Sequence, residues 1–320
     1  MGRGGGVWLV KEGVVPSSSF RLSKTASPAS TPMRRKVSAW IELLKPVTWI
    51  PIMCAYVAGA LCSAKFTTAS LADWRLWLGL VMSGPLISGT CQAMNDYFDR
   101  DVDAINEPYR PIPSGRISLR EATLGISLLC GLTLVAAYLI HPWIVALAVI
   151  GIVNAHLYSA KPIKLKRIVW VGNATVAASY ILLPWMSGEL AFKGQISWTA
   201  TAVAVCYVIA SIGSMTTNDF KSLEGDARMA IHTLPQVFGV RRGAWLGVFV
   251  LNAGQLAAAG LLATLGEWGW AGLVGATVLP QMWFQRTFLA DPIGKAVWYN
   301  AHAQGFLVLG MFLAAWAVRA

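Results

Sequence analysis

The acidic residues of this chain gather in two short segments. Of its 15 Asp and Glu residues, five lie within NDYFDRDVDAINEP, residues 95–108, and three lie within NDFKSLEGD, residues 218–226. In the first segment the oxygen-bearing side chains recur at helical intervals of three and four, which places them on one face of a helix. These residues are Asn95, Asp96, Asp99 and Asp103. Clustered oxygen ligands suit a hard cation such as Mg²⁺, which commonly joins carboxylates to substrate phosphates.

The second segment repeats the pattern with fewer acids. Asp219 and Asp226 are seven residues apart, which is two helical turns, and Glu224 lies between them. Helix capping would explain one acid in each segment, but it does not explain eight. We therefore predict a metal and diphosphate site whose catalytic acids are Asp96, Asp99, Asp103, Asp219 and Asp226, with Asn95 as a further metal ligand.

Basic residues flank both acidic segments. A diphosphate leaving group is held and neutralised by metal together with Lys and Arg side chains. We predict that the diphosphate-binding residues are Arg100, Arg110, Lys161, Lys164, Lys166, Lys221 and Arg228. We interpret Arg116, Arg120 and Arg167 as residues that only set the membrane topology.

The elements that position these residues are membrane helices. Of the 320 residues, 56% are hydrophobic and only 13% are charged, whereas soluble domains carry roughly 25% charged residues. A bilayer-spanning helix needs roughly 20 apolar residues. The sequence predicts an all-α integral membrane bundle of about nine transmembrane helices, at 47–64, 74–94, 121–140, 142–160, 168–187, 196–216, 243–265, 268–285 and 297–318. The tight connection at 140–142 would also allow one kinked span.

The basic residues predict the orientation of the bundle. With nine spans, 22 of the 26 Lys and Arg residues fall on the side that holds the N-terminus and both acidic segments. Because positive residues favour the cytoplasmic side, we expect the site and the N-terminus to be cytoplasmic. The net charge of +11 then serves anionic lipid and an anionic substrate, and it does not indicate nucleic-acid binding.

Residues 1–38 differ in composition from the rest of the chain. They are rich in Ser, Gly and Arg and hold a single acid, Glu12. We predict a disordered or targeting tail, and Met33 would serve equally well as the start of the protein. Residues 39–320 are expected to form a single transmembrane domain. The five cysteines lie in or beside spans without a CxxC pair, so we interpret them as small apolar residues.

The motif NDxxDxxxD at Asn95, Asp96, Asp99 and Asp103 resembles that of the UbiA superfamily of intramembrane prenyltransferases. DAINEPYRPIPSG (103–115), PIKLK (162–166) and NDFKSLEGD (218–226) look like the chlorophyll and bacteriochlorophyll synthase branch. RPIPSGRI (110–117) and DPIGKAVWYN (291–300) look more like the bacteriochlorophyll enzymes. In the partner motif DxxxD of the superfamily, Ser222 takes the place of the first acid, and Asp219 is the candidate to replace it.

The resemblance implies a nine-helix bundle with a central cavity and a cytoplasmic cap. It also implies Mg²⁺-dependent transfer of a geranylgeranyl or phytyl group from its diphosphate to the propionate of a (bacterio)chlorophyllide, in a photosynthetic or cytoplasmic membrane. The further partners that it implies are membrane lipid and pigment-handling proteins. Because the acceptor carboxylate is already ionised at pH 7, no general base is needed. Aromatic residues that could face the allylic cation are Tyr97, Phe98, Tyr158 and Trp185.

Three alternatives fit parts of the sequence. A transporter can hold intramembrane acids, but it would not concentrate eight of them at two helix ends. A UbiA-type enzyme that makes a quinone or haem precursor would use a phenol or vinyl acceptor, and INEPYRPIPSG (105–115) argues against it. A pigment-binding scaffold without activity would not need both acidic segments.

Overall fold

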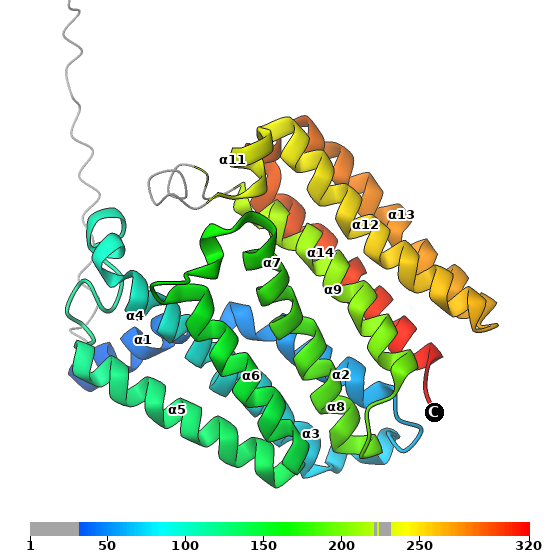
Figure 1. The fold of residues 1–320 in the computed structure, drawn as a ribbon, viewed down its shortest axis with the longest axis horizontal. Coiled ribbons are helices and arrows are strands. Elements are labelled where there is room, and N and C mark those ends of the chain that lie inside the picture. Colours follow the sequence, from blue (N-terminus) through cyan, green and yellow to red (C-terminus); the bar gives the residue numbers. More distant parts are fainter. Residues whose placement is uncertain (1–31, 221–222, 224–231) are drawn as a thin grey trace, which may run out of the picture.

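The protein is helical throughout the part that the structure describes. The computed structural model describes residues 32–220, 223 and 232–320, and these residues form α-, 3₁₀- and π-helices without a β-strand (Figure 1). The predicted all-α fold class is confirmed. The predicted site residues Lys221, Asp226 and Arg228 lie outside the described residues, and so do Ser222 and Glu224 of the second acidic segment.

The main helices cover each of the nine predicted spans. α3 and α4 are joined by the π-helical segment η3 (Met82–Ser88), and α7 and α8 by the π-helical segment η5 (Ala178–Leu182). The bounds are α1 (Pro32–Leu44), α2 (Trp49–Leu61), α3 (Trp74–Val81), α4 (Gly89–Asn106), α5 (Leu119–Ile140), α6 (Pro142–Ser159), α7 (Val169–Ala177), α8 (Leu183–Lys193), α9 (Trp198–Asp219), α11 (Leu234–Phe238), α12 (Val240–Thr264), α13 (Trp268–Ala290) and α14 (Pro292–Ala317).

Length and hydropathy identify a membrane protein. Six helical segments of the described chain are long and apolar enough to cross a bilayer. The predicted spans at 74–94, 268–285 and 297–318 are helical too, in α3–α4, α13 and α14, but they are not among those six. On α5 the large side chains Leu124, Leu128 and Val135 are exposed. Apolar side chains exposed along a long helix are suited to contact with lipid.

The connection between α5 and α6 is a true break. His141 has an extended backbone, with φ −165°, and its ring nitrogen accepts a hydrogen bond from the backbone N–H of Trp143. Pro142 follows as the first residue of α6, a position where proline is tolerated because the N–H of that residue has no partner within the helix. The structure therefore has two helices here, and not one kinked span.

Glycines bring the helices into close contact. α2 and α8 cross where Gly59 faces the backbone of Trp185 and Gly188 faces the backbone of Tyr56. A Cβ atom at either glycine would collide with a backbone carbonyl of the other helix. Gly213 and Gly254 play the same part between α9 and α12. Small residues at such crossings are the usual means by which membrane helices pack.

Helix α1 begins at Pro32, inside the range 1–38 for which the sequence predicts a tail. Its apolar side chains explain why it is ordered. Ala39 and Leu43 are fully buried, and they pack with Ala93 of α4 and with Ile117 and Ala122 in one hydrophobic cluster. From Ala39 onward the helix therefore packs within the folded bundle.

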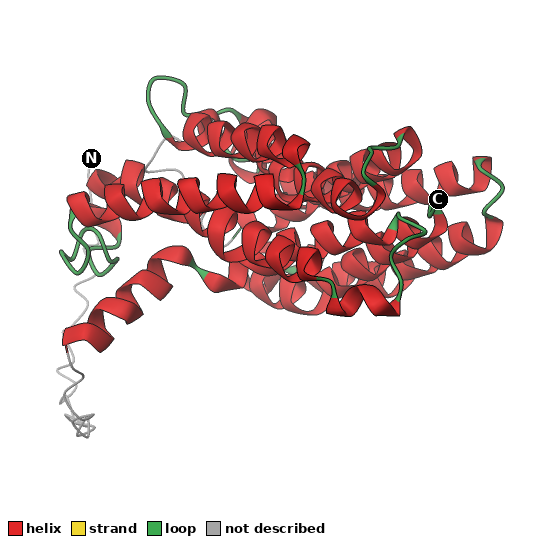
Figure 2. Cartoon of the chain, turned by 90° about the horizontal axis from the view of Figure 1, so that it is seen from below, coloured by secondary structure: helices red, strands yellow, loops and turns green. Residues whose placement is uncertain are grey.

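The described parts of the two acidic segments lie at one end of the bundle. The α4–α5 loop, the loop between α6 and α7 and the end of α9 lie on the same side of the molecule, opposite the α12–α13 turn and the C-terminus (Figures 1 and 2). This arrangement brings together residues that are more than 100 positions apart in the sequence. We call this end of the molecule the motif end.

Candidate active site

The first acidic segment forms the last three turns of α4. Asp96, Asp99 and Asp103 retain only 2%, 6% and 5% of their exposed surface. Asp101, on the other face of the same helix, is exposed. The predicted clustering of the acids on one helical face is therefore present. Burying three carboxylates is costly unless each has partners.

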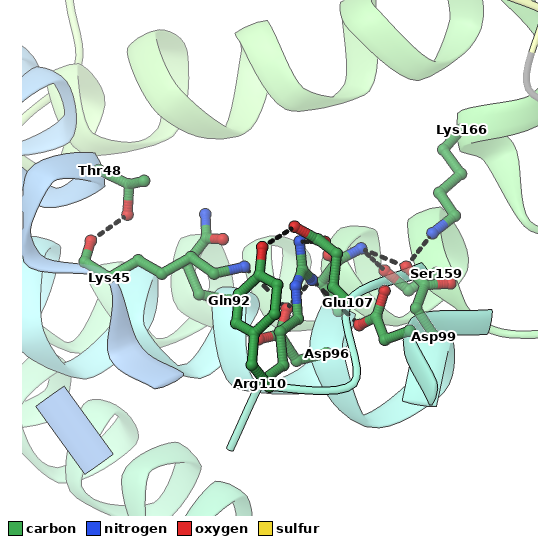
Figure 3. Close-up of polar contacts among 12 residues, drawn as sticks. Lys45, Thr48, Gln92, Asp96, Asp99, Glu107, Arg110, Ser159 and Lys166 are labelled. Carbon is green, nitrogen blue, oxygen red and sulfur yellow. Dashed lines mark hydrogen bonds and ion pairs between the residues drawn. The ribbon is translucent and has the colours of Figure 1, made fainter. Parts of the chain in front are cut away.

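Four cationic side chains from three parts of the chain supply those partners, and Figure 3 labels three of them, Lys45, Arg110 and Lys166. Lys45 Nζ lies 2.7 Å from Asp96 Oδ1. Arg110 lies 3.1 Å from Asp96 and 3.0 Å from Asp103, and it also pairs with Glu107. Asp99 pairs with two lysines of the α6–α7 loop, Lys164 at 3.2 Å and Lys166. In Figure 3, Lys45 and Lys166 reach the acids from opposite sides.

Two of these lysines have an unusual backbone. Lys45 and Lys164 adopt the left-handed conformation, with φ 47° and 46°, and each directly precedes a short 3₁₀-helix, η1 (Pro46–Thr48) or η4 (Leu165–Arg167). In a residue other than glycine this conformation costs about 1–3 kcal/mol, and it concentrates at functional sites. The ammonium groups of both lysines contact acids of α4. The strained backbone therefore occurs at residues that form the site.

The amide of Asn95 completes the first segment. Its Nδ2 donates to Asp99 Oδ2 and to Ser159 Oγ, both at 3.2 Å. These contacts leave the carbonyl oxygen of Asn95 as the atom suited to bind a metal. Asp99 Oδ1 is buried and has no hydrogen-bond partner, although Lys164 lies beside it as an ion pair. Oxygen atoms of this kind are the ligands that Mg²⁺ prefers.

The described residues do not form a metal cage by themselves. Within the described ranges, no three His, Cys, Asp or Glu side chains come close enough together to hold an ion. Mg²⁺ is typically bound by one or two carboxylates together with waters and substrate phosphates. A linear row of carboxylates beside cations fits that mode, because the substrate itself supplies the remaining oxygens.

In the cluster, burial and the neighbouring charges shift the pKa values in opposite directions. Burial raises the pKa of Asp103 to about 6, and the Arg110 guanidinium opposes this shift. Burial lowers the pKa of Lys166, and Asp99 opposes that shift. Burial would also lower the pKa of Arg110, but the carboxylates around it outweigh this effect and raise it. The closely packed cations at the motif end would attract a polyanionic ligand.

The second acidic segment is described only in part. Asp219 is the last residue of α9, and its Oδ2 accepts a hydrogen bond from Asn173 Nδ2 of α7 at 3.4 Å. It lies at the motif end, as the sequence predicts. Its partner Asp226 and the basic residues Lys221 and Arg228 are outside the described residues.

Several predicted diphosphate-binding residues lie away from the cluster. Arg100 donates to the backbone carbonyl of Tyr97, stacks on that ring at 5.0 Å and pairs with Asp101. Lys161 is exposed. Arg116 forms a two-pronged ion pair with Glu42, at 2.6 and 2.8 Å, which agrees with its interpretation as a residue outside the site. Of the predicted basic residues that the structure describes, Arg110, Lys164 and Lys166 pair with the buried acids Asp96, Asp99 and Asp103.

Three cavities lie inside the bundle below the acids. The motif cavity, of about 200 Å³, is lined by Asn95, Tyr158 and Tyr180 among others. The inner cavity, of about 40 Å³, continues it toward Met82 and Ile144. The third, the α14 cavity, has a volume of about 300 Å³ and lies between α2, η5, α9 and α14. The two π-helical segments η3 and η5 both line the inner cavity, and such segments often occur at functional sites.

The predicted aromatic residues have different positions. Tyr158 lines the motif cavity. Trp185 is fully buried and stacks on Tyr207 at 6.4 Å. Tyr97 and Phe98 pack edge to face against each other at 5.5 Å. Trp185, Tyr97 and Phe98 are not among the residues that line these three cavities.

Sequence reasoning missed two residues of the site. Lys45 contacts Asp96 across 51 positions, and its only sequence signal is a basic residue at the start of the first span. Tyr180 lines the cavities from the middle of a predicted span, and nothing in its sequence neighbourhood distinguishes it from a packing residue. Both depend on tertiary contacts that a local pattern does not encode.

Comparison with known proteins connects this geometry to a family. The model of the UbiA prenyltransferase family matches residues 49–316, which include the three buried acids together with Arg110, Lys164 and Lys166. The chain belongs to the UbiA prenyltransferase family. A solved UbiA homolog from Archaeoglobus fulgidus, bound to GPP and Mg²⁺, superposes on the chain with a TM-score of 0.66 at 18% identity, covering 84% of this chain and 99% of that one. This likeness confirms the UbiA fold.

Two relatives indicate the branch of the family. The chloroplastic chlorophyll synthase of Arabidopsis thaliana is 41% identical over 285 residues, which cover 87% of this chain and 73% of that protein. The bacteriochlorophyll synthase 33 kDa chain of Cereibacter sphaeroides is 39% identical over 299 residues, which cover 91% of this chain and 95% of that protein. This UbiA prenyltransferase is therefore similar to both kinds of enzyme over most of its length.

Proposed function

We propose that this prenyltransferase is a (bacterio)chlorophyll synthase. It transfers a geranylgeranyl or phytyl group from its diphosphate to the propionate carboxylate of a (bacterio)chlorophyllide and releases diphosphate. The observation that carries the proposal is the identity of about 40% to chlorophyll and bacteriochlorophyll synthases over most of the chain. Between the two acceptors we favour bacteriochlorophyllide, because of the segments RPIPSGRI (110–117) and DPIGKAVWYN (291–300).

The site residues have distinct proposed roles. Mg²⁺, when bound, would neutralise the diphosphate and lower the barrier to its departure. Asn95, Asp96, Asp99 and Asp103 would hold it, together with Asp219 and Asp226 of the second acidic segment. Arg110, Lys164 and Lys166 already lie beside the first acids, and we assign them, with Lys45, to the diphosphate oxygens.

The acceptor carboxylate does not need a general base from the protein. The carbon–oxygen bond between the prenyl group and diphosphate breaks, and the electron pair leaves with the diphosphate. An oxygen of the propionate then forms the ester bond with the same carbon. Because a carboxylate is ionised at pH 7, the task of the cavity walls is to hold the two substrates together and to exclude water.

Product analysis tests this function. Membranes that contain the protein are incubated with geranylgeranyl diphosphate, Mg²⁺ and either chlorophyllide or bacteriochlorophyllide, and the products are identified by mass spectrometry. We expect the esterified pigment to form with at least one acceptor and to disappear when EDTA removes the metal. Prenylation of a phenolic quinone precursor, with no esterified pigment from either chlorophyllide, would refute the proposal.

A further inference from the structure

The last turn of α9 is held by a chain of hydrogen bonds to α14. Asn300 Nδ2 donates to Asn218 Oδ1 at 2.9 Å, and Asn300 Oδ1 accepts from Thr217 Oγ1 at 2.7 Å. Gln304, one turn further along α14, donates to the same Oδ1 at 3.0 Å and accepts from Ser214 Oγ at 2.9 Å. Because both its nitrogen and its oxygen have partners, the Asn300 amide has a fixed orientation.

A second set of contacts holds the residue after Asp219. Phe220 is almost fully buried, and its ring packs edge to face on Phe288 of α13 at 5.4 Å. Phe288 in turn stacks on Tyr299 of α14 at 5.1 Å. The residues before and after Asp219 are therefore both held through consecutive residues of α14, one by hydrogen bonds and one by ring contacts.

The position of Asp219 explains why such support matters. Asp219 is the last residue of α9, and the last carbonyls of a helix have no partner within it, so helix ends fray. Mg²⁺ requires nearly ideal octahedral geometry, with oxygen atoms at about 2.0–2.1 Å. A ligand must therefore be held within about 0.5 Å of its place. A carboxylate at a helix end meets this requirement when that end is fixed to the rest of the fold.

We propose that Asn300 is a positioning residue for the second acidic segment. Its amide holds Asn218 and thereby fixes the direction in which Asp219 leaves α9. The inference rests on the proposed function, because it takes Asp219 as a ligand of Mg²⁺. It also gives a role to the segment DPIGKAVWYN (291–300), which ends at Asn300 and has no other role in the site.

Buried amides also join membrane helices without a role in any site. Gln281 of α13 is an example, because it is buried and its Nε2 donates to Asn252 at 2.9 Å and to Gln255 at 2.7 Å, both on α12. The hydrogen bonds of these three side chains stay between α12 and α13. A substitution of Gln281 therefore removes an amide between helices without removing a hydrogen bond to α9.

Matched substitutions to leucine separate the two roles. Asn300→Leu and Gln281→Leu each remove a hydrogen-bonded amide and leave a side chain of similar size, so both should lower the Tm in detergent. We expect Asn300→Leu to raise the Mg²⁺ concentration for half-maximal turnover at least about tenfold. Gln281→Leu should leave that concentration within about twofold of the wild-type value, because weaker packing lowers the amount of folded protein and not its affinity for metal.

A binding measurement makes the test independent of turnover. Mn²⁺ serves as the probe, and its binding is followed by electron paramagnetic resonance in the presence of an unreactive thiolo analogue of geranylgeranyl diphosphate. We expect the Kd of Mn²⁺ to rise at least about fivefold in Asn300→Leu and to change less than about twofold in Gln281→Leu. Gln304→Leu removes one of the two donors to Asn300 and should cause a smaller rise. It is the second variant to use if Asn300→Leu does not fold.

A double-mutant cycle tests whether Asn300 acts through Asn218. If it does, Asn300→Leu should change the Kd of Mn²⁺ by less than about twofold when it is added to Asn218→Leu, because the contact is already lost. If the two substitutions instead multiply their separate effects, Asn300 acts independently of Asn218, and the inference is overturned.

The outcomes separate this inference from the proposed function. If the wild type esterifies chlorophyllide but Asn300→Leu and Gln304→Leu keep the wild-type Kd of Mn²⁺ and the wild-type Mg²⁺ requirement, the positioning role is wrong while the function stands. An equal rise in Gln281→Leu would also contradict that role. A wild type that esterifies neither pigment refutes the proposed function. The Mn²⁺ measurement then still decides the role of Asn300, because metal and donor analogue bind without an acceptor.

Discussion

At the scale of single residues, the structure distinguishes acids that the sequence presents side by side. Asp96, Asp99 and Asp103 are buried among cations, whereas the Asp101 side chain is 84% exposed and pairs with Arg100. Burial of a carboxylate is costly, and helix packing alone would be served better by apolar residues. We therefore expect the three buried acids to take part in binding metal and substrate, and we do not expect this of Asp101.

This contrast gives a matched pair of variants. Asp99→Asn removes one charged oxygen from the cluster and should lower kcat/KM at least about a hundredfold, roughly 2.7 kcal/mol of barrier. Asp101→Asn makes the same chemical change two residues away and should alter the rate less than about threefold. The measurement is steady-state turnover in detergent with Mg²⁺ in excess. An equal loss of kcat/KM in both variants would show that turnover depends on the total charge of the segment and not on the acids of the buried face.

The sequence predicts some of these residues and misses others for a physical reason. Intervals of three and four residues fix the face of a helix, so the positions of Asp96, Asp99 and Asp103 could be predicted. The partner of a long basic side chain depends on the tertiary fold. Arg100, which is in the motif, turns back to Tyr97, whereas Lys45, which is far from it in sequence, reaches Asp96.

At the scale of the elements, hydropathy predicted nine segments that are helical in the described chain, and six of them lie in helices long and apolar enough to cross a bilayer. It did not predict the π-helical segments η3 and η5, because a local change in hydrogen bonding leaves the apolar pattern intact. It also did not predict α1, since polar residues around Ala39 and Leu43 mask these buried positions.

The crossing of α2 and α8 predicts a specific sensitivity. Gly188→Ala would place a methyl group against the backbone carbonyl of Tyr56, and a backbone cannot move aside as a flexible side chain can. We expect a loss of about 1–3 kcal/mol in stability, seen as a lower Tm in detergent. Gly131→Ala on α5 is the control, because no atom lies within 4 Å of the added methyl group. A wild-type Tm for Gly188→Ala would mean that the two helices are not in contact.

At the scale of the whole molecule, charge and fold agree on which connections share an end. The loops with most Lys and Arg residues are those that carry the acidic segments and the lysines of the α6–α7 loop. In the structure the α4–α5 loop, the α6–α7 loop and the end of α9 lie at the motif end (Figures 1 and 2). The uneven distribution of Lys and Arg is suited to two roles, since positive residues favour the cytoplasmic side and also attract an anionic diphosphate.

This agreement predicts that the motif end faces the cytoplasm, which cysteine labelling can test. Ile105, at the end of α4, is 82% exposed, and Leu265, at the α12–α13 turn, is 47% exposed at the opposite end. With the protein in a bacterial inner membrane, an impermeant maleimide should label Leu265→Cys in spheroplasts and Ile105→Cys only in inverted vesicles, because it cannot cross the bilayer. The wild type, with its five native cysteines, provides the background signal. The reversed pattern would contradict the orientation but not the fold, whereas labelling of both positions from one side would contradict the number of crossings between α4 and α12.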